Sequence, residues 1–143
     1  AELLGRLGPL DAAVMLDVIE HLERPDDVVR ALADALRPGA PLLLTTGDWE
    51  SAVARVMGKR WRLMTPPQHL WYFGANSIRT LLERVGMEVA LVEHPWKRVP
   101  LGLIAYQLGR MTRTQRWLGK ANAIRAGVPV NLFDAMRVVA IKR

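Results

Sequence analysis

The chain has 143 residues, half of them hydrophobic, and carries a formal net charge of +6. This length and composition suffice for one domain with a buried core, which argues against intrinsic disorder. The absence of cysteine excludes disulfides, thiolate metal sites and thiol catalysis. No uncharged apolar stretch is long enough to span a membrane and no signal peptide is recognisable, so we expect a soluble, cytoplasmic protein.

The first part of the sequence alternates strand-like and helix-like patterns. Residues 11–19, DAAVMLDVI, form an apolar run broken only by Asp17, which predicts a parallel strand buried on both faces. A helix is expected from Pro25, because proline is tolerated in a first turn and two aspartates follow it. Residues 41–46, PLLLTT, predict a second buried strand, so the fold class is α/β.

The rest of the chain continues this alternation. The expected elements are a weak helix over 50–57, a long loop over 58–73, a helix over 75–85, a strand over 87–92 and a last strand over 135–141. Asn76 or Ser77 is placed to cap the helix over 75–85, and Gly86 is placed to end it. Residues 101–120 combine an apolar stripe with a basic face, which predicts an amphipathic helix that either contacts a membrane surface or packs on the core.

Three short motifs occur in order along this pattern. They are DVIEHL at 17–22, LRPGA at 36–40 and HLWYF at 69–73. With these motifs the sequence resembles class I S-adenosylmethionine-dependent methyltransferases, most closely the small-molecule enzymes of the ubiquinone-biosynthesis type. The resemblance covers residues 10–92 and, as the last strand, 133–142. Residues 95–132 match no pattern of the family and are expected to be a helical insertion.

The resemblance implies a particular part of the methyltransferase fold. The expected elements correspond to the fourth to seventh strands of the family's seven-stranded Rossmann-like sheet, the last strand being antiparallel. In the family, a glycine-rich cofactor loop follows the first strand and an acidic residue ends the second, both before the position of Asp17. Gly5 and Gly8 do not follow a strand and therefore cannot form this cofactor loop. We therefore expect the C-terminal half of a methyltransferase domain, inactive by itself.

The resemblance also implies candidate site residues after the first strand. Leu16, Asp17, Val18 and Glu20 would line the S-adenosylmethionine pocket, and His21 would act as general base for a hydroxyl acceptor, since its ordinary pKa is near 6.5. Alternatively, Asp17 binds loop amides, while Glu20 and His21 brace the next helix. Adjacent Glu20 and His21 lack the spacing of metal ligands on one helix face, so no metal site is expected.

Candidate substrate residues lie further along the chain. Asp48 and Trp49 follow the second strand, where α/β proteins bind ligands, although loop capping is an alternative. His69 is a third candidate, and its alternative is a structural role in its loop. The run GKRWR at 58–62 offers cations and an indole to nucleic acid, but it is typical of a solvated loop, so no nucleic-acid partner is expected. His94 has no evident partner and receives no role.

Two hypotheses of function follow. In the first, the intact protein transfers a methyl group from S-adenosylmethionine to an oxygen, nitrogen or carbon atom of a small molecule, chiefly by orienting the reactants in a dry pocket. In the second, a degenerate methyltransferase half is a non-catalytic interaction domain that binds a membrane surface or a partner through residues 101–120. Under either hypothesis, we expect self-association through the exposed edge of the strand at 12–16.

Overall fold

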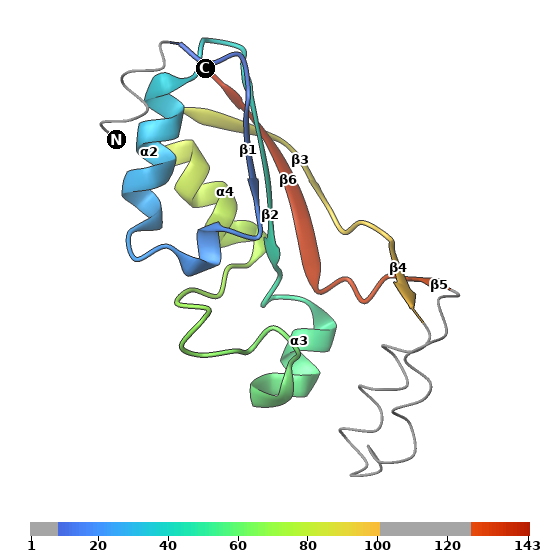
Figure 1. Cartoon of the computed structure of the whole chain (residues 1–143). Coiled ribbons are helices and arrows are strands. Elements are labelled where there is room, and N and C mark those ends of the chain that lie inside the picture. The colour runs from blue at the N-terminus through green and yellow to red at the C-terminus, as the bar shows by residue number, and fades with distance from the viewer. Residues whose placement is uncertain (1–8, 101–126) are drawn as a thin grey trace, which may run out of the picture. The chain divides into compact units, whose positions relative to one another are not determined.

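A computed structural model describes residues 9–100 and 127–143 (Figure 1). The chain divides into two compact units. The first comprises Ala1–Pro95 and Leu132–Arg143, and the second comprises Trp96–Asn131. The first unit contains the motifs identified in the sequence.

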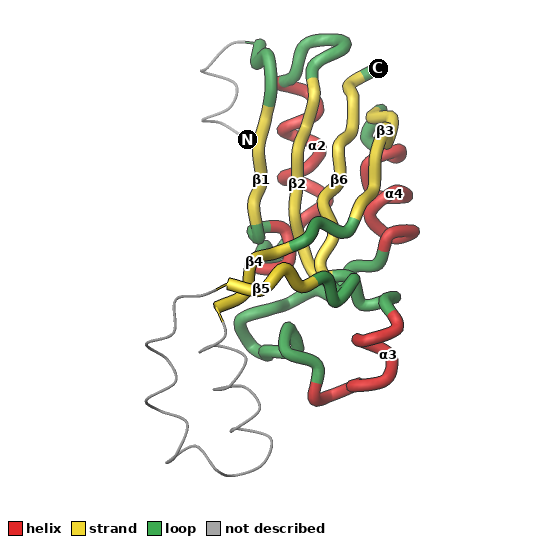
Figure 2. The backbone as a smooth tube through the Cα atoms, turned by 90° about the vertical axis from the view of Figure 1, so that its right-hand side faces the viewer, coloured by secondary structure: helices red, strands yellow, loops and turns green. Residues whose placement is uncertain are grey.

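The first unit is built on a four-stranded mixed sheet (Figure 2). Its strands, in spatial order, are β1 (Ala13–Leu16), β2 (Pro41–Gly47), β6 (Ala135–Lys142) and β3 (Met87–Glu93). β1 and β2 are parallel, whereas β6 runs antiparallel to both β2 and β3. The expected α/β class, with about four strands and an antiparallel last strand, is therefore confirmed.

Helices α2 (Pro25–Ala35) and α4 (Ala75–Arg84) lie together on one face of this sheet (Figures 1 and 2). α2 begins at Pro25, as expected for a residue without an N–H group. α4 is followed by Gly86, whose φ of 77° is a backbone conformation that glycine adopts readily. The remaining short helices are η1 (Ile19–His21), α3 (Ala52–Met57) and η2 (Gly58–Arg60).

The start of α4 corrects one expectation. The N-cap is Gly74, whereas Asn76 and Ser77 both lie within the first helical turn. The Ser77 hydroxyl accepts a hydrogen bond from the Gly74 N–H at 2.9 Å and donates one to the Gly74 carbonyl at 3.0 Å. Ser77 therefore stabilises the helix start from the third helical position, which sequence alone did not distinguish from the cap position.

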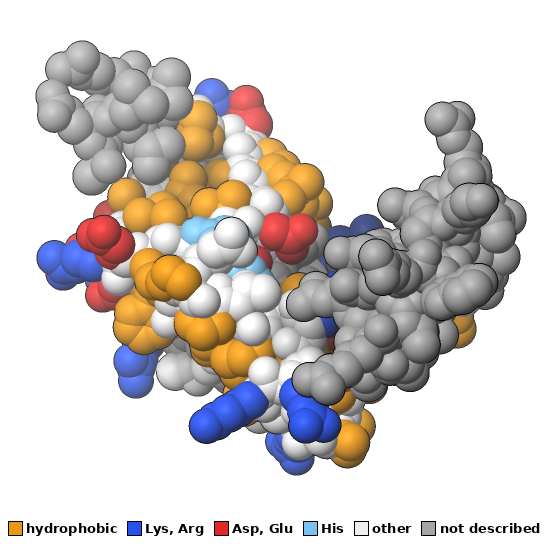
Figure 3. Space-filling model, turned by 60° about the horizontal axis from the view of Figure 1, so that its bottom comes forward, with side chains coloured by type: hydrophobic (Ala, Val, Ile, Leu, Met, Phe, Trp, Pro, Cys, Tyr) orange, Lys and Arg blue, Asp and Glu red, His pale blue; other side chains and the backbone are white. Residues whose placement is uncertain are grey.

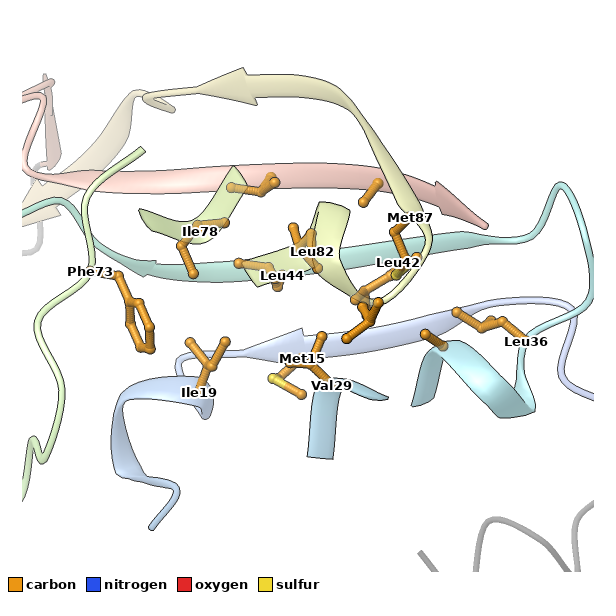
Figure 4. Packing of buried hydrophobic residues seen from close by; sticks show 14 of the residues in the cluster. Met15, Ile19, Val29, Leu36, Leu42, Leu44, Phe73, Ile78, Leu82 and Met87 are labelled. Atoms are coloured by element: carbon orange, nitrogen blue, oxygen red, sulfur yellow. The ribbon is translucent and has the colours of Figure 1, made fainter. Parts of the chain in front are cut away.

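The hydrophobic core lies between the sheet and the two helices on its face (Figure 4). β1 contributes Met15, and β2 contributes Leu42 and Leu44. The side chains facing them from the helices include Val29, Ile78 and Leu82, all fully buried. Burial of a side chain of this size stabilises the fold by about 1.5–3 kcal/mol, so this layer supplies the main driving force for folding.

The other face of the sheet contradicts the expectation that β1 is buried on both faces. Val14 is 63% exposed and Leu16 is 56% exposed, while Met15 between them is buried. Successive side chains of a strand point to opposite faces, and Met15 packs in the core with Val29 of α2 and Ile78 of α4 (Figure 4), so both helices lie on its face. The apolar run at 11–19 does contain a strand, but β1 is shorter than expected, and among the described residues only one of its faces is covered.

The second unit contains a two-stranded antiparallel sheet formed by β4 (Lys97–Pro100) and β5 (Gly127–Val130). Strands at these positions were not expected, because the sequence predicted a helical insertion over residues 95–132. The expected basic helix at 101–120 lies outside the described residues. Among the helices that are described, none is long and apolar enough to cross a membrane.

Candidate functional site

The turn after β1 is held by reciprocal contacts with β2. Asp17 has a φ of 52°, a left-handed conformation that is uncommon for residues other than glycine. Its N–H donates to both the carbonyl and the hydroxyl of Thr45, each at 3.1 Å, and the Thr45 hydroxyl donates to Asp17 Oδ1 at 2.9 Å. These bonds stabilise the turn, and they leave Leu16, Asp17 and Val18 exposed at the carboxyl end of β1.

Glu20 joins three segments that are distant in sequence. Its carboxylate is buried and accepts a hydrogen bond from the Thr46 hydroxyl at 2.9 Å. Its backbone carbonyl accepts hydrogen bonds from the N–H groups of Leu70 at 2.8 Å and Trp71 at 3.3 Å. The turn after β1, the end of β2 and the HLWYF motif therefore meet at this residue.

His21, the predicted general base, lies at the surface beside His69, a predicted substrate residue. The two imidazole rings make an edge-on contact, with centroids 4.8 Å apart. His21 Nδ1 lies 2.7 Å from the carbonyl oxygen of Gln68. A carbonyl oxygen only accepts hydrogen bonds, so Nδ1 must carry a proton, and in the neutral ring Nε2 then holds the lone pair. The Gln68 carbonyl thus fixes the orientation of the His21 ring.

An aromatic cluster extends from His69 toward the end of β2. Tyr72 lies 6.3 Å from His69 and 6.1 Å from Trp49, measured between ring centroids. Trp49 also contacts Trp61 at 5.7 Å. On the corresponding face of the molecule, histidine side chains reach the surface among hydrophobic side chains (Figure 3). The predicted substrate residues Trp49 and His69 thus belong to one cluster, linked through Tyr72.

Asp48, the other predicted substrate residue, has its carboxylate engaged within the protein. The side chain is buried, accepts a hydrogen bond from the Glu50 N–H at 2.9 Å and pairs with His94 Nε2 at 2.8 Å. His94 also lies beside the ring of Phe133, with centroids 5.9 Å apart. Sequence reasoning missed His94, although one signal was available, because Asp48 and His94 each lie two residues beyond the end of an expected strand.

Two residues of the basic run at 58–62, Trp61 and Arg62, bind a buried carboxylate. Trp61 Nε1 donates to Asp134 Oδ2 at 3.0 Å, and Arg62 donates to both oxygens of Asp134 at 2.8 Å. Burial acts to raise the pKa of Asp134, but the hydrogen bonds from Arg62 and Trp61 and the charge of Arg62 outweigh it, so the pKa is lowered. Trp61 is itself buried and presents no stacking surface for a nucleic-acid base.

A match to a protein-family model identifies the family of this fold. A family model described as a methyltransferase domain matches residues 4–92, which include β1, β2, both helices on the sheet and the HLWYF motif. The chain belongs to this methyltransferase domain family. The match includes the turn after β1 and the His21–His69 contact.

Solved structures share the fold of this methyltransferase domain. A SAM-dependent methyltransferase from Thermotoga maritima is 14% identical with a TM-score of 0.58, and the alignment covers 95% of this chain and 57% of that one. One from Archaeoglobus fulgidus is 16% identical with a TM-score of 0.55, covering 99% and 64%. Magnesium protoporphyrin IX methyltransferase from Synechocystis, solved with bound SAH, is 14% identical with a TM-score of 0.52, covering 95% and 46%.

These likenesses establish the fold of the methyltransferase domain. The chain spans 46% to 64% of the length of the three neighbours described. A comparison with curated proteins finds no significant match. Of the predicted site residues, His69 contacts His21 in the segment after β1 and is linked through Tyr72 to Trp49, which lies beside Asp48 at the end of β2.

Proposed function

We propose that this methyltransferase domain belongs to an enzyme that transfers the methyl group of S-adenosylmethionine to a small-molecule acceptor. The observation that carries the proposal is the turn after β1, where exposed Leu16, Asp17 and Val18 precede a histidine with a fixed tautomer. This turn lies at the carboxyl ends of the parallel strands β1 and β2, where α/β proteins bind ligands.

The residues of this turn fit S-adenosylmethionine chemically. Leu16 and Val18 supply exposed apolar surface suited to the adenosine part, and Asp17 supplies a carboxylate suited to a cationic group. When bound, this cofactor provides an electrophilic methyl group on a sulfonium. Because the chain spans only 46% to 64% of the length of these neighbours, we assign the cofactor and the activity to the whole protein.

In the proposed reaction, the protein orients the acceptor and removes its proton where one must leave. His21 Nε2 holds the lone pair required for general-base catalysis, since Nδ1 is bound to Gln68. Leu70 and Trp71 are 47% and 45% exposed, and their backbones are fixed to Glu20. The apolar surfaces of these two side chains favour an acceptor with an apolar body. Contact with them would exclude water from that body and direct the reactive atom of the acceptor toward the histidines.

Trp49 and His69 complete the proposed acceptor side. Trp49 contacts Tyr72, and Tyr72 contacts His69, so one aromatic cluster spans both residues. Asp48 is assigned no direct contact with the acceptor, because both of its carboxylate oxygens already have partners within the protein. The alternative of a non-catalytic domain gains no support from the family match, and the helix on which it depended lies outside the described residues.

Calorimetric titration of the full-length protein with S-adenosylmethionine tests the proposal. We expect saturable binding, weakened by Asp17→Ala, which removes the carboxylate of the turn and its bond to Thr45. Asp26→Ala is the matched control, because Asp26 is exposed at the start of α2 and outside the proposed site. Absence of binding to the wild-type protein, or equal loss in both variants, would count against the proposed cofactor site.

A further inference from the structure

Glu20 is a buried carboxylate without a basic partner among the described residues. Its side chain accepts one hydrogen bond, from the neutral hydroxyl of Thr46. The ion pairs of the described part of the chain join other acidic groups to arginine or to His94. Burial of a carboxylate without a compensating cation is costly, so a positive charge at this position would stabilise the fold.

The neighbours of Glu20 are the two imidazoles of His21 and His69. One ligand atom from each of the three residues lies within 4.8 Å of the others. His21 Nδ1 is bound to the Gln68 carbonyl, the arrangement by which proteins commonly orient a metal-binding histidine and leave Nε2 for the ion. The Thr46 hydroxyl orients the Glu20 carboxylate in the same manner.

We propose that Glu20, His21 and His69 bind one divalent transition-metal ion. Two imidazoles and one carboxylate suit zinc, cobalt, manganese or ferrous iron, whereas magnesium and calcium prefer all-oxygen sites. The three ligand atoms all lie within 4.8 Å of one another, a spacing from which three side chains can share one ion. The ion supplies the positive charge that the buried Glu20 carboxylate otherwise lacks.

Three protein ligands leave coordination positions open, and His21 is exposed to solvent. An acceptor hydroxyl bound at an open position would lose its proton to solvent more readily, because the ion lowers the pKa of that hydroxyl. In this arrangement the ion occupies the Nε2 lone pair and replaces His21 as the group that promotes deprotonation. This use of the ion rests on the proposed methyl transfer, whereas metal binding itself does not.

The sequence alone predicted no metal site, because it offered only adjacent Glu20 and His21. The third ligand comes from the loop before α4. Hydrogen bonds from the N–H groups of Leu70 and Trp71 to the Glu20 carbonyl bring this loop to the turn after β1. Trp71 Nε1 adds a bond of 2.8 Å to the Leu22 carbonyl, so the loop is attached on both sides of His21.

Cobalt binding tests the site directly. The full chain, purified without a histidine tag and stripped with a chelator, is titrated with Co²⁺ and followed by its visible absorption and by calorimetry. We expect one ion per chain, with affinity at least about tenfold weaker in His21→Gln and His69→Gln. The sequence has three histidines, so His94→Gln, which alters the remaining one, is the matched control and should bind cobalt normally.

A second measurement avoids substitutions altogether. Substoichiometric Mn²⁺ should broaden the imidazole proton signals of His21 and His69 in NMR spectra, and those of His94 much less. Equal broadening of all three, or cobalt binding that neither His21→Gln nor His69→Gln weakens, would overturn the proposed site. Titration of chelator-treated protein with S-adenosylmethionine is read separately, so failure of metal binding is distinguishable from failure of cofactor binding.

Discussion

The indole Nε1 of Trp61 donates a hydrogen bond of 3.0 Å to Asp134 Oδ2, across 73 residues of sequence. Arg62 adds two bonds of 2.8 Å to the same carboxylate. Asp134 directly precedes β6, and its backbone carbonyl accepts from the Asp48 N–H at 2.9 Å. Asp134 therefore fixes two segments beside β6: its carboxylate binds the loop after η2, and its backbone carbonyl binds the end of β2.

Substitution of Asp134 should change both stability and its dependence on pH. The pKa of Asp134 is lowered in the folded protein, so its ionised form contributes stability above about pH 4, and this contribution is lost as pH falls through the folded pKa. Asp134→Asn should lower the free energy of unfolding by roughly 2 kcal/mol at pH 7, with a smaller difference below about pH 3. Urea denaturation at both pH values measures this.

Asp11→Asn is the matched control for this prediction. Asp11 also pairs with an arginine, Arg37, but both side chains are largely exposed. Exposed ion pairs contribute little, so this variant should differ from wild type by less than about 1 kcal/mol. If the two variants lose equal stability at neutral pH, the buried Asp134 network does not have the assigned role.

The hydrogen bond from Thr46 to Glu20 should matter more than the similar bond from Thr45 to Asp17. Thr46→Val keeps the shape of the side chain but removes a hydroxyl from a buried carboxylate, which should cost about 1–3 kcal/mol. Thr45→Val removes a bond to exposed Asp17, where water can replace it, and should cost less. Equal unfolding free energies for the two variants would contradict the burial argument.

Gly47 should tolerate no side chain without movement of the loop after α3. A Cβ atom at this position would lie 2.9 Å from Leu63 Cδ1 and 2.9 Å from Trp61 Cη2. Gly47→Ala should therefore displace the Trp61 ring and lower stability by roughly 1–3 kcal/mol. Tryptophan fluorescence and urea denaturation report the two effects, and Gly47→Ala/Leu63→Ala should recover part of the loss. A single variant identical to wild type in both measurements would refute this packing.

The elements that sequence predicted well are those with strong local signals. Pro25 begins α2, Gly86 follows α4, and the apolar run at 41–46 forms a strand that the structure extends by one residue. Each of these depends on backbone constraints or on hydrophobic periodicity within a few residues. The resemblance to methyltransferases, based on three short motifs, is confirmed at the family level.

The relationships that sequence did not predict are long-range. The approach of His69 to His21 depends on backbone hydrogen bonds from the HLWYF motif to the Glu20 carbonyl, which no local pattern encodes. The Asp48–His94 pair depends on β2 and β3 both lying beside β6. The exposure of Val14 depends on which face the helices cover, and alternation within an apolar strand carries no such information.

The exposed edge of β1 leads to the last prediction, which is self-association. β1 pairs with β2 on one side, and it is the outermost strand of the sheet formed by the described residues. Val14 and Leu16 are exposed on it, and an apolar edge strand with free backbone groups tends to recruit another chain. Sedimentation velocity should therefore show species larger than the monomer, and their fraction should increase with protein concentration.

Val14→Lys should shift the distribution toward monomer, because a charge on an edge strand opposes pairing. Val56→Lys is the control and should not do so, since Val56 is 88% exposed but lies on α3. A sedimentation coefficient independent of concentration, or equal effects of both lysine substitutions, would exclude β1 as the associating edge.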